Sequence, residues 1–256
     1  MGRKLRIKAN FDIIFQGFFM DREEILLKNW YAVQNSLSRA CSNARRDKQE
    51  VTLVAVTKYA KDTDVLTLLH KGLLTHIGES RVQDAWKRWK QNELFAPFTQ
   101  VKKHFIGHLQ LNKAAKAAVL FDFIDSLDSV ALAQALSKAV PAGKALRVLV
   151  QIKLTRKESQ SGLSLPQARE LVKKLRALNL PAIRVCGYMG IAPQGKTSQT
   201  LRELFKQVKA VFDEDFFGEE EKYLSLGMSE DFEIAVEEGS SLPRIGSKLF
   251  SDHLEE

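Results

Sequence analysis

A lysine at the end of an apolar stretch is the first residue in this sequence that could do chemistry. Residues 51–58 read V-T-L-V-A-V-T-K, a run rich in β-branched residues that ends at Lys58. Such a run is typical of a strand that is buried on both faces of a parallel sheet. Ligands of α/β folds gather at the carboxyl ends of strands, where a half-desolvated ammonium can lose its proton and attack an aldehyde. Taken alone, the run fits better with a lysine that is merely the first solvated residue.

A second group of residues, near the C-terminus, is suited to binding an anion. Gly227 lets the backbone turn close to a ligand, and Ser229 opens a predicted helix whose free N–H groups favour negative charge. Residues 244–247 (Arg-Ile-Gly-Ser) add a cation, exposed backbone and a hydroxyl. In α/β barrels, phosphate commonly lies on the loops after strands seven and eight. The alternative is that Ser229 is only a helix N-cap, because Glu230 and Asp231 already complement the helix dipole.

Metal and nucleophile motifs are not found in the sequence. His76, His104 and His108 come from different segments without the spacing of metal ligands, so we interpret them as core or rim residues. Cys41 and Cys186 match no metal or redox spacing, and Cys186 lies in an apolar run. Neither a nucleophile elbow nor a glycine-rich phosphate loop occurs.

Composition excludes several classes of protein. The 256 residues carry a formal charge of +8, but Lys and Arg are mixed with Asp and Glu along the chain. Basic clusters such as 87–90 do not alternate with aromatic residues, so we expect a solvated basic surface and no nucleic-acid partner. No apolar run is long enough for a membrane span, and a signal peptide is not expected in residues 1–20. Two cysteines are compatible with a reducing cytoplasm, and we expect a monomer.

Strand and helix patterns alternate from residue 21 onward. We predict one domain over residues 21–256, preceded by an extension (1–20) and opening with an extra helix over 21–44. The α/β pattern repeats every 25–30 residues or so, as in a (β/α)8 TIM-type barrel of about 250 residues. A doubly wound open sheet is the alternative, because strand order is not visible in a sequence. The predicted strands span 51–58, 75–78, 104–107, 121–124, 146–152, 182–189, 223–225 and 242–245. The predicted helices after them span 62–72, 82–96, 112–119, 128–139, 166–178, 198–212 and 229–238.

Polar and glycine residues follow almost every predicted strand. In a barrel, all of these positions meet at one rim, where ligands bind. They include Lys58, Ser80, His108, Gln110, Ser126, Met189, Ser229, Arg244, Gly246 and Ser247.

Several ordered stretches resemble the pyridoxal phosphate homeostasis protein family. They are 53–58 (LVAVTK), 77–79 (IGE), 104–113 (HFIGHLQLNK), 124–128 (IDSLD), 187–191 (GYMGI), 226–235 (LGMSEDFEIA) and 244–250 (RIGSKLF). The resemblance covers about residues 22–251, and the two longest stretches are specific. It implies a fold similar to the N-terminal barrel of alanine racemase.

The resemblance also implies a cofactor and its contacts. Lys58 would hold pyridoxal 5′-phosphate as a Schiff base, while Ser229 and the backbone of Gly246 and Ser247 would hold its phosphate. Arg244 would lie near the pyridine nitrogen and keep it unprotonated, which makes the ring a weaker electron sink. We expect the remaining cofactor-binding residues to come from the same rim: Ser80, His108, Ser126 and Met189. Ser80 stands where the family usually has Asn, and Gln160 where it usually has Lys.

The function implied is intracellular homeostasis of pyridoxal phosphate, in which the protein holds the cofactor and delivers it to apoenzymes. The sequence ends soon after the last predicted strand, so we expect no second domain of the kind that completes alanine racemase. The alternative is a racemase that acts from the barrel alone, with Tyr59 or His108 as its second acid/base. A nucleic-acid-binding barrel is a third, weaker hypothesis.

Overall fold

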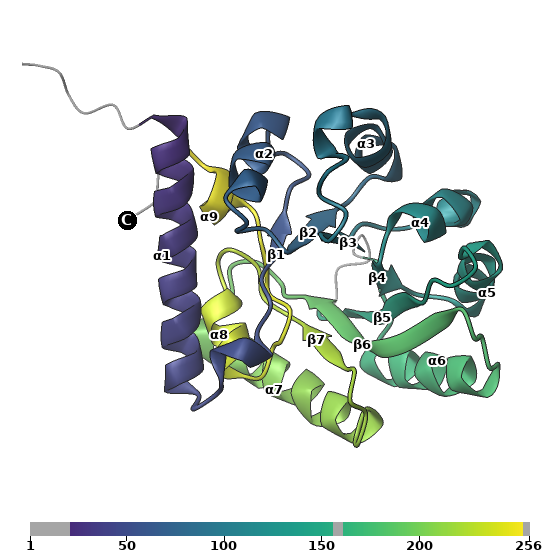
Figure 1. Cartoon of the computed structure of the whole chain (residues 1–256). Helices are drawn as coiled ribbons and strands as arrows, with labels where there is room; N and C mark the ends of the chain where they lie inside the picture. The colour runs from purple at the N-terminus through teal and green to yellow at the C-terminus, as the bar shows by residue number, and fades with distance from the viewer. Residues whose placement is uncertain (1–20, 156–160, 253–256) are drawn as a thin grey trace, which may run out of the picture.

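A closed ring of parallel strands forms the centre of the molecule. The computed structural model describes residues 21–155 and 161–252, and these form one eight-stranded sheet. Its order is β7-β6-β5-β4-β3-β2-β1-β8, so strands that follow each other in the chain are neighbours and β8 returns to pair with β1. This order is that of a (β/α)8 barrel and excludes the doubly wound alternative. Helices surround the strands (Figure 1), and the predicted extension 1–20 lies outside the described residues.

The strands are β1 (Val54–Val56), β2 (His76–Glu79), β3 (Lys102–Phe105), β4 (Phe123–Leu127), β5 (Leu146–Lys153), β6 (Ile183–Ile191), β7 (Tyr223–Ser225) and β8 (Arg244–Ile245). The α-helices are α1 (Arg22–Asn43), α2 (Asp62–His70), α3 (Val82–Trp86), α4 (Ala114–Leu120), α5 (Val130–Ala139), α6 (Leu165–Ala177), α7 (Ser198–Asp215), α8 (Phe232–Glu237) and α9 (Ser247–Phe250).

Buried side chains form two layers, one on each side of the strands. The larger layer lies between strands and helices and contains residues such as Ile77 and Val148. A smaller cluster fills the barrel interior with Val54, Leu149 and Met189, among others. Because successive side chains of a strand point to opposite faces, the buried strands read as continuous apolar runs, as the sequence predicted.

The predicted extra helix, α1, is confirmed and packs on the outside of the barrel against α2, α8 and α9 (Figure 1). It begins with a capping box, in which Asp21 accepts a hydrogen bond from the Glu24 N–H and Glu24 accepts one from Asp21. Its buried face includes Leu26, Val33 and Leu37, which recur at helical spacing. The helix therefore covers elements that carry the end of the chain.

The barrel closes between β7 and the segment 240–244 that leads into β8, and we call this junction the seam. Backbone hydrogen bonds join it, among them the one from the Arg244 N–H to the Gly227 carbonyl oxygen at 3.0 Å, and serine side chains add to them. The Leu224 N–H donates to Ser241 Oγ at 3.0 Å, and the Leu226 N–H donates to Ser240 Oγ at 3.1 Å. The fully buried Ser240 hydroxyl also lies 2.7 Å from the Leu226 carbonyl oxygen. Regular ladders pair β7 with β6 and β8 with β1, whereas no regular ladder joins β7 to β8 in the described sheet.

Several predicted boundaries are wrong by a few residues. The third strand, predicted over 104–107, lies at 102–105, where its register follows β2. The first strand is shorter than 51–58, because Thr52 and Val54 bond to the coil segment that precedes β8. Asp128 does not cap α5, since Ser129 accepts the hydrogen bond from the Leu132 N–H.

The helix predicted over 82–96 divides into three turns. It begins as α3, continues as a π-helical turn (Lys87–Gln91) and ends as a 3-10 turn (Glu93–Phe95). The break occurs at Asn92, whose extended backbone stops the first turns and whose side chain accepts a hydrogen bond from the Leu94 N–H. The wide π-helical turn carries Arg88, which is only 12% exposed.

A bulge in β4 turns two polar residues toward the barrel interior. Ile124 pairs with Val148 and Leu127 with Val150, so the segment between them in β4 has one residue more than in β5. All four of these residues belong to the layer between strands and helices. The two residues between Ile124 and Leu127, Asp125 and Ser126, therefore both face inward.

Candidate functional site

A cavity of about 730 Å³ opens at the carboxyl ends of the strands and collects both groups of chemically suited residues. It is lined by Lys58 and Tyr59 after β1, by the loop after β6, and by residues after β7 and β8. The predicted site residues that line it are Lys58, Ser229, Arg244, Gly246 and Ser247. The structure thus brings the lysine and the anion-binding residues to one cavity, although 170 residues separate Lys58 from Met228 in the chain.

Lys58 lies on a tight turn, Thr57–Ala60, that we call the Lys58 turn. The Ala60 N–H donates to the Thr57 carbonyl oxygen at 3.0 Å, which closes the turn. Lys58 is exposed, and its Nζ lies 4.9 Å from the centre of the Tyr59 ring, which is itself 85% exposed. The turn projects beyond the strand and leaves the Lys58 side chain at the mouth of the cavity.

The backbone after β7 turns tightly into the cavity at Gly227. Its φ is +88°, and a Cβ atom there would lie 2.7 Å from the Phe232 Cα atom, so only glycine fits. Ser229 follows and is buried, but it does not open the helix as predicted. Helix α8 begins at Phe232, and the Asp231 carboxylate accepts a hydrogen bond from the Met228 N–H at 2.6 Å. Ser229 is therefore not an N-cap.

The residues after β8 approach β1 closely. A Cβ atom on Gly246 would lie 3.1 Å from the Val56 carbonyl oxygen, so glycine lets this backbone reach the cavity wall. Ser247 begins the short helix α9 and is exposed. Ser229, Gly246 and Ser247 offer hydroxyl and backbone groups to the cavity, and we call them the phosphate cup after the ligand group proposed for them below; Glu230 and Asp231 line the same cavity.

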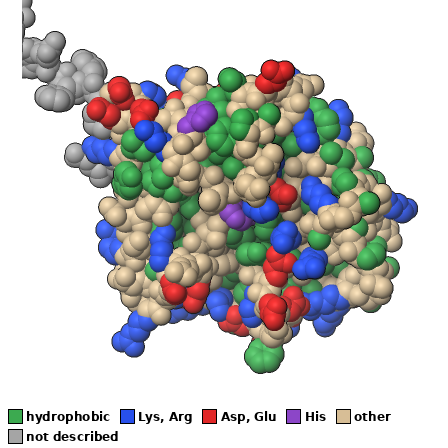
Figure 2. Space-filling view, in the orientation of Figure 1, with side chains coloured by type: hydrophobic (Ala, Val, Ile, Leu, Met, Phe, Trp, Pro, Cys, Tyr) green, Lys and Arg blue, Asp and Glu red, His purple; other side chains and the backbone are tan. Residues whose placement is uncertain are grey.

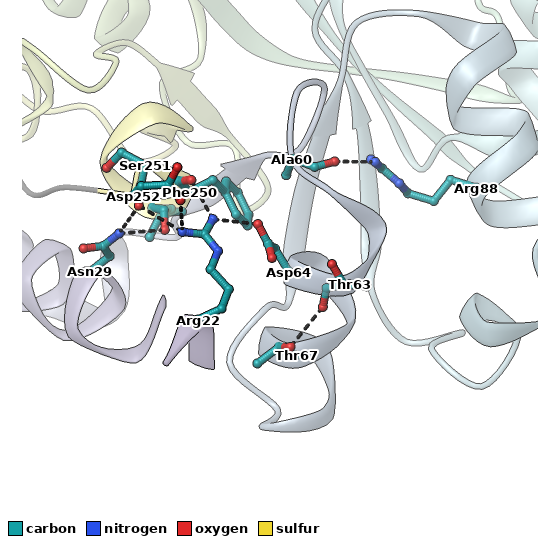
Figure 3. A network of polar contacts seen from close by, with 11 residues as sticks. Arg22, Asn29, Ala60, Thr63, Asp64, Thr67, Arg88, Phe250, Ser251 and Asp252 are labelled. Carbon is teal, nitrogen blue, oxygen red and sulfur yellow. Dashed lines mark hydrogen bonds and ion pairs between the residues drawn. The ribbon is translucent and has the colours of Figure 1, made fainter. Parts of the chain in front are cut away.

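Side chains from α1 and α2 hold the far end of α9 (Figure 3). Arg22 donates to the carbonyl oxygens of Phe250 at 2.8 Å and Ser251 at 3.3 Å, and it pairs with Asp64 at 2.6 Å. Asn29 donates to the carbonyl oxygen of Ser251 at 3.1 Å. The exposed carbonyl groups at the end of the helix are thereby satisfied, and the segment that carries Gly246 and Ser247 is anchored to the outer helix.

Arg244 is the buried cation of the site, with an exposed fraction of only 3%. Its guanidinium donates to the Ser225 carbonyl oxygen at 2.8 Å, to Ser225 Oγ at 2.7 Å and to the Gly190 carbonyl oxygen at 2.9 Å. Burial lowers the pKa of Arg244, and the negative charges of Asp125 and Asp231 oppose that shift. The side chain is held by neutral oxygens, with its charge balanced at longer range.

A chain of polar groups lies behind Arg244 in the barrel. The Asp125 carboxylate lies 3.0 Å from His104 Nδ1, and His104 Nε2 lies 2.9 Å from His76 Nδ1. In one tautomer arrangement, Asp125 accepts a hydrogen bond from His104 Nδ1, and His104 Nε2 accepts one from His76 Nδ1. Burial lowers the pKa of His76 to about 3, with a further contribution from His104. No cluster with metal-binding geometry occurs among the described residues.

The other predicted site residues do not line the main cavity. Ser80 is half-buried after β2, and His108 is exposed, with Nδ1 3.6 Å from an Asp128 carboxylate oxygen. Met189 is fully buried in the interior cluster. Ser126 is 1% exposed, and its Oγ has no hydrogen-bond partner among the described residues. A buried hydroxyl without a partner is unusual and is suited to a ligand.

Sequence reasoning missed the loop after β6 and two arginines that support the site. Residues 192–196 also line the cavity, and Pro193 and Gly195 are the local turn signals in this loop. Arg88 belonged to a cluster that we interpreted as solvated surface, yet it contacts the Lys58 turn. Arg22 contacts α9 from the other end of the chain. Contacts of this kind are set by the fold and leave no local pattern.

Lys and Arg are interspersed with Asp and Glu over the face in Figure 2. None of the helices in the described part of the chain has the length and apolar character that crossing a bilayer requires.

Comparison with known proteins agrees with this geometry. Residues 32–253 match the family model described as alanine racemase, N-terminal domain. Alanine racemase of Clostridium difficile has a similar fold, with a TM-score of 0.66 over 90% of this chain and 61% of that chain at 15% identity.

More similar proteins share a narrower description. The pyridoxal phosphate homeostasis protein of Haemophilus influenzae is 32% identical over 87% of this chain and 93% of its own length. That of Synechocystis is 35% identical over 80% of this chain and 92% of its own. The structure of PipY of Synechococcus elongatus with pyridoxal phosphate bound matches with a TM-score of 0.70 at 31% identity, over 84% of this chain and 100% of PipY. The chain belongs to the pyridoxal phosphate homeostasis protein family.

Proposed function

We propose that this protein binds pyridoxal 5′-phosphate in the cavity, holds it covalently on Lys58 and supplies it to apoenzymes. The observation that carries the proposal is that one cavity joins Lys58 to the phosphate cup and to the buried Arg244. A lysine and a candidate anion site in one cavity match a ligand with an aldehyde and a phosphate. The names of its relatives and the ligand of PipY support the same choice.

The residues present fit this cofactor. Gly246 lets the backbone reach the cavity wall where a larger residue would meet Val56, which suits close contact with a phosphate. The buried Ser126 hydroxyl has no partner among the described residues, so it can serve a polar group of a ligand inside the barrel. We include Ser80, His108 and Met189 in the proposed cofactor site from the family resemblance alone.

Each residue has a distinct role in this proposal. Pyridoxal phosphate supplies an aldehyde, with which a lysine amine forms a covalent imine. Lys58 would supply the neutral amine for that aldehyde, and the aldehyde oxygen would leave as water with both amine protons. Ser229 and the backbone of Gly246 and Ser247 hold the phosphate by hydrogen bonds to charged oxygens. Arg244 would place a fixed cation near the ring nitrogen and so keep that nitrogen unprotonated, as the family resemblance implies.

Delivery requires that the cofactor can enter and leave. The exposed side chains of Lys58 and Tyr59 lie at the mouth of the cavity, so the covalent bond is open to water and to a receiving protein. We propose that the protein acts as a monomer in the cytoplasm; Cys41 and Cys186 are both free and buried, which suits a reducing compartment.

The direct test is to load the protein with pyridoxal phosphate, reduce it with borohydride and map the modified peptide. We expect one adduct, on Lys58, and its loss in Lys58→Ala without loss of the fold. Lys61→Ala is the matched control, because Lys61 is an exposed lysine only three positions along the chain. A full yield of adduct in Lys58→Ala would refute the assignment. The loaded protein should also activate an apoenzyme, which tests delivery separately.

The alternative is amino-acid racemisation from the barrel alone. Tyr59 favours it, because this residue lines the cavity beside Lys58 and could act as a second acid/base. His108, the other candidate, is not a lining residue of the cavity. Exchange of the α-proton of alanine in deuterated water separates the two functions. Turnover of about 1 per second or faster that Lys58→Ala abolishes would favour the enzyme.

A further inference from the structure

Arg88 binds both ends of the Lys58 turn from outside the barrel. Its guanidinium donates to the Thr57 carbonyl oxygen at 3.1 Å and to the Ala60 carbonyl oxygen at 3.0 Å. The second of these contacts is drawn in Figure 3. The Ala60 N–H already closes the turn on the Thr57 carbonyl, so one guanidinium spans the residues on either side of Lys58 and Tyr59.

Two carboxylates hold the Arg88 side chain in this position. Arg88 Nε lies 2.7 Å from Asp62 Oδ1, and Nη1 lies 2.6 Å from Oε1 of Glu79, whose side chain is only 2% exposed. Burial lowers the pKa of Arg88, but Glu79 and Asp62 outweigh it and leave the pKa above its usual value. The guanidinium is therefore a permanent cation with four acceptors in a fixed geometry, which a lysine cannot reproduce.

The same cluster connects the turn to the neighbouring strand. The Thr57 hydroxyl donates to Glu79 Oε1 at 2.8 Å, and the Thr57 N–H donates to the Gly78 carbonyl oxygen at 3.0 Å. The backbone at the base of Lys58 is thus held from β2, through Glu79, and from the π-helical turn, through Arg88. No contact of Arg88 reaches the phosphate cup, which lies after β7 and β8.

We infer that Arg88 is a positioning residue that holds the Lys58 turn so that the amine meets the aldehyde of a cofactor whose phosphate is already in the cup. The inference rests on the proposed function. Lys58 is exposed and has a flexible four-carbon stem, so the position of its backbone decides where the amine can reach. Rigid support matters for such a reaction, since a displacement of about 1 Å can cost on the order of 100-fold in rate.

The test separates covalent bonding from phosphate binding. Pyridoxine 5′-phosphate, which has no aldehyde, measures the phosphate cup alone by titration calorimetry. Borohydride trapping after mixing with pyridoxal phosphate measures the rate and yield of the Lys58 adduct. We expect Arg88→Gln to slow adduct formation by about tenfold or more while the Kd of pyridoxine phosphate changes less than about twofold. Arg88→Lys should restore little, because an ammonium cannot reach both carbonyl groups and both carboxylates.

Arg81→Gln is the matched control, because it removes the same charge from a neighbouring arginine that is 74% exposed and does not touch the turn. An unchanged rate of adduct formation in Arg88→Gln would overturn the inference. So would a parallel loss of pyridoxine phosphate binding, which indicates a general loss of structure. If Arg88→Gln does not fold, Asp62→Asn weakens the same contact and must slow trapping alone. A wild-type protein without an adduct would instead refute the proposed function.

Discussion

The buried Arg244 shows how a single residue can combine support and function. Its guanidinium is saturated by oxygens of Ser225 and Gly190, which are neutral, and its balancing carboxylates stand further away. An arginine keeps its proton in such a place in spite of burial. The cation therefore also binds β6 and β7 to β8, so its removal would disturb the barrel as well as any ligand.

At the residue scale, the lowered pKa of His76 predicts that the stability of the protein falls at acidic pH. Its pKa in the folded protein, about 3, lies below the ordinary value of 6.5. Above pH 6.5 the His76 ring is neutral in both the folded and the unfolded state, so its titration does not reduce the free energy of unfolding. Between pH 6.5 and 3 the unfolded chain binds a proton that the folded protein excludes, and stability falls by up to about 1.4 kcal/mol per pH unit.

Urea denaturation between pH 4.5 and 7.5 measures this effect. His76→Gln should flatten the slope, whereas His70→Gln, which changes an exposed histidine at the end of α2, should leave it unchanged. The same slope in all three proteins would show that His76 does not titrate as its surroundings imply.

At the scale of elements, α1 holds the last helix of the barrel, and Arg22 is the residue that connects them. Arg22→Ala removes hydrogen bonds to Phe250 and Ser251 and leaves the buried Asp64 without its cation. We expect a loss of about 2 kcal/mol in the free energy of unfolding, typical for hydrogen bonds of a charged group. Phosphate binding should weaken as well, because α9 begins at Ser247.

Arg39→Ala is the control for that experiment. Arg39 also lies on α1 and also forms an ion pair, with Glu233, but its side chain is 63% exposed. Exposed pairs contribute less than about 1 kcal/mol. Equal losses in the two variants, measured by urea denaturation, would contradict the role given to Arg22.

The elements were predictable because buried strands and amphipathic helices leave regular patterns in the sequence. The eight strands, the seven helices between them and α1 were found in this way, with shifted boundaries at β3 and α8, whereas the short helix α9 after β8 was not predicted. Strand order was not visible, because pairing depends on residues far apart in the chain. The bulge that turns Asp125 and Ser126 inward was equally hidden, since it exists only relative to β5.

The site residues that could be predicted are those whose type and position at a strand end already indicate a role. Lys58, Ser229, Arg244, Gly246 and Ser247 lie in one cavity, as the rim of a barrel requires. Arg88 was misjudged because three basic residues within four positions look like a solvated surface, while its burial depends on Glu79 and Asp62. Residues that support a site take their role from their partners, which are found only in the folded chain.

At the scale of the whole molecule, the phosphate cup lies across the seam. Ser229 follows β7, whereas Gly246 and Ser247 follow β8, and serine side chains join the two strands. A phosphate bound by both sides would connect them. We expect pyridoxal phosphate to slow hydrogen exchange of the Leu224 and Leu226 amides. At a ligand concentration of 100 times the Kd, the slowing should reach up to about 100-fold, because binding then stabilises the closed seam by about 2.7 kcal/mol.

Pyridoxal without the phosphate is the control, because it can still react with Lys58 but has nothing to place in the cup. Amides of the long β5–β6 ladder, such as Val150, report on the rest of the sheet and should respond less. Equal protection by pyridoxal and pyridoxal phosphate would contradict this role of the phosphate.

Binding of the ligand and closure of the seam are therefore coupled equilibria. If the ligand favours the closed seam, then by linkage an open seam must favour departure of the ligand to the same degree. A receiving protein would not have to compete for the aldehyde alone. By separating the two strands beside Ser240, it would loosen the phosphate, and the seam would become the route by which the ligand leaves.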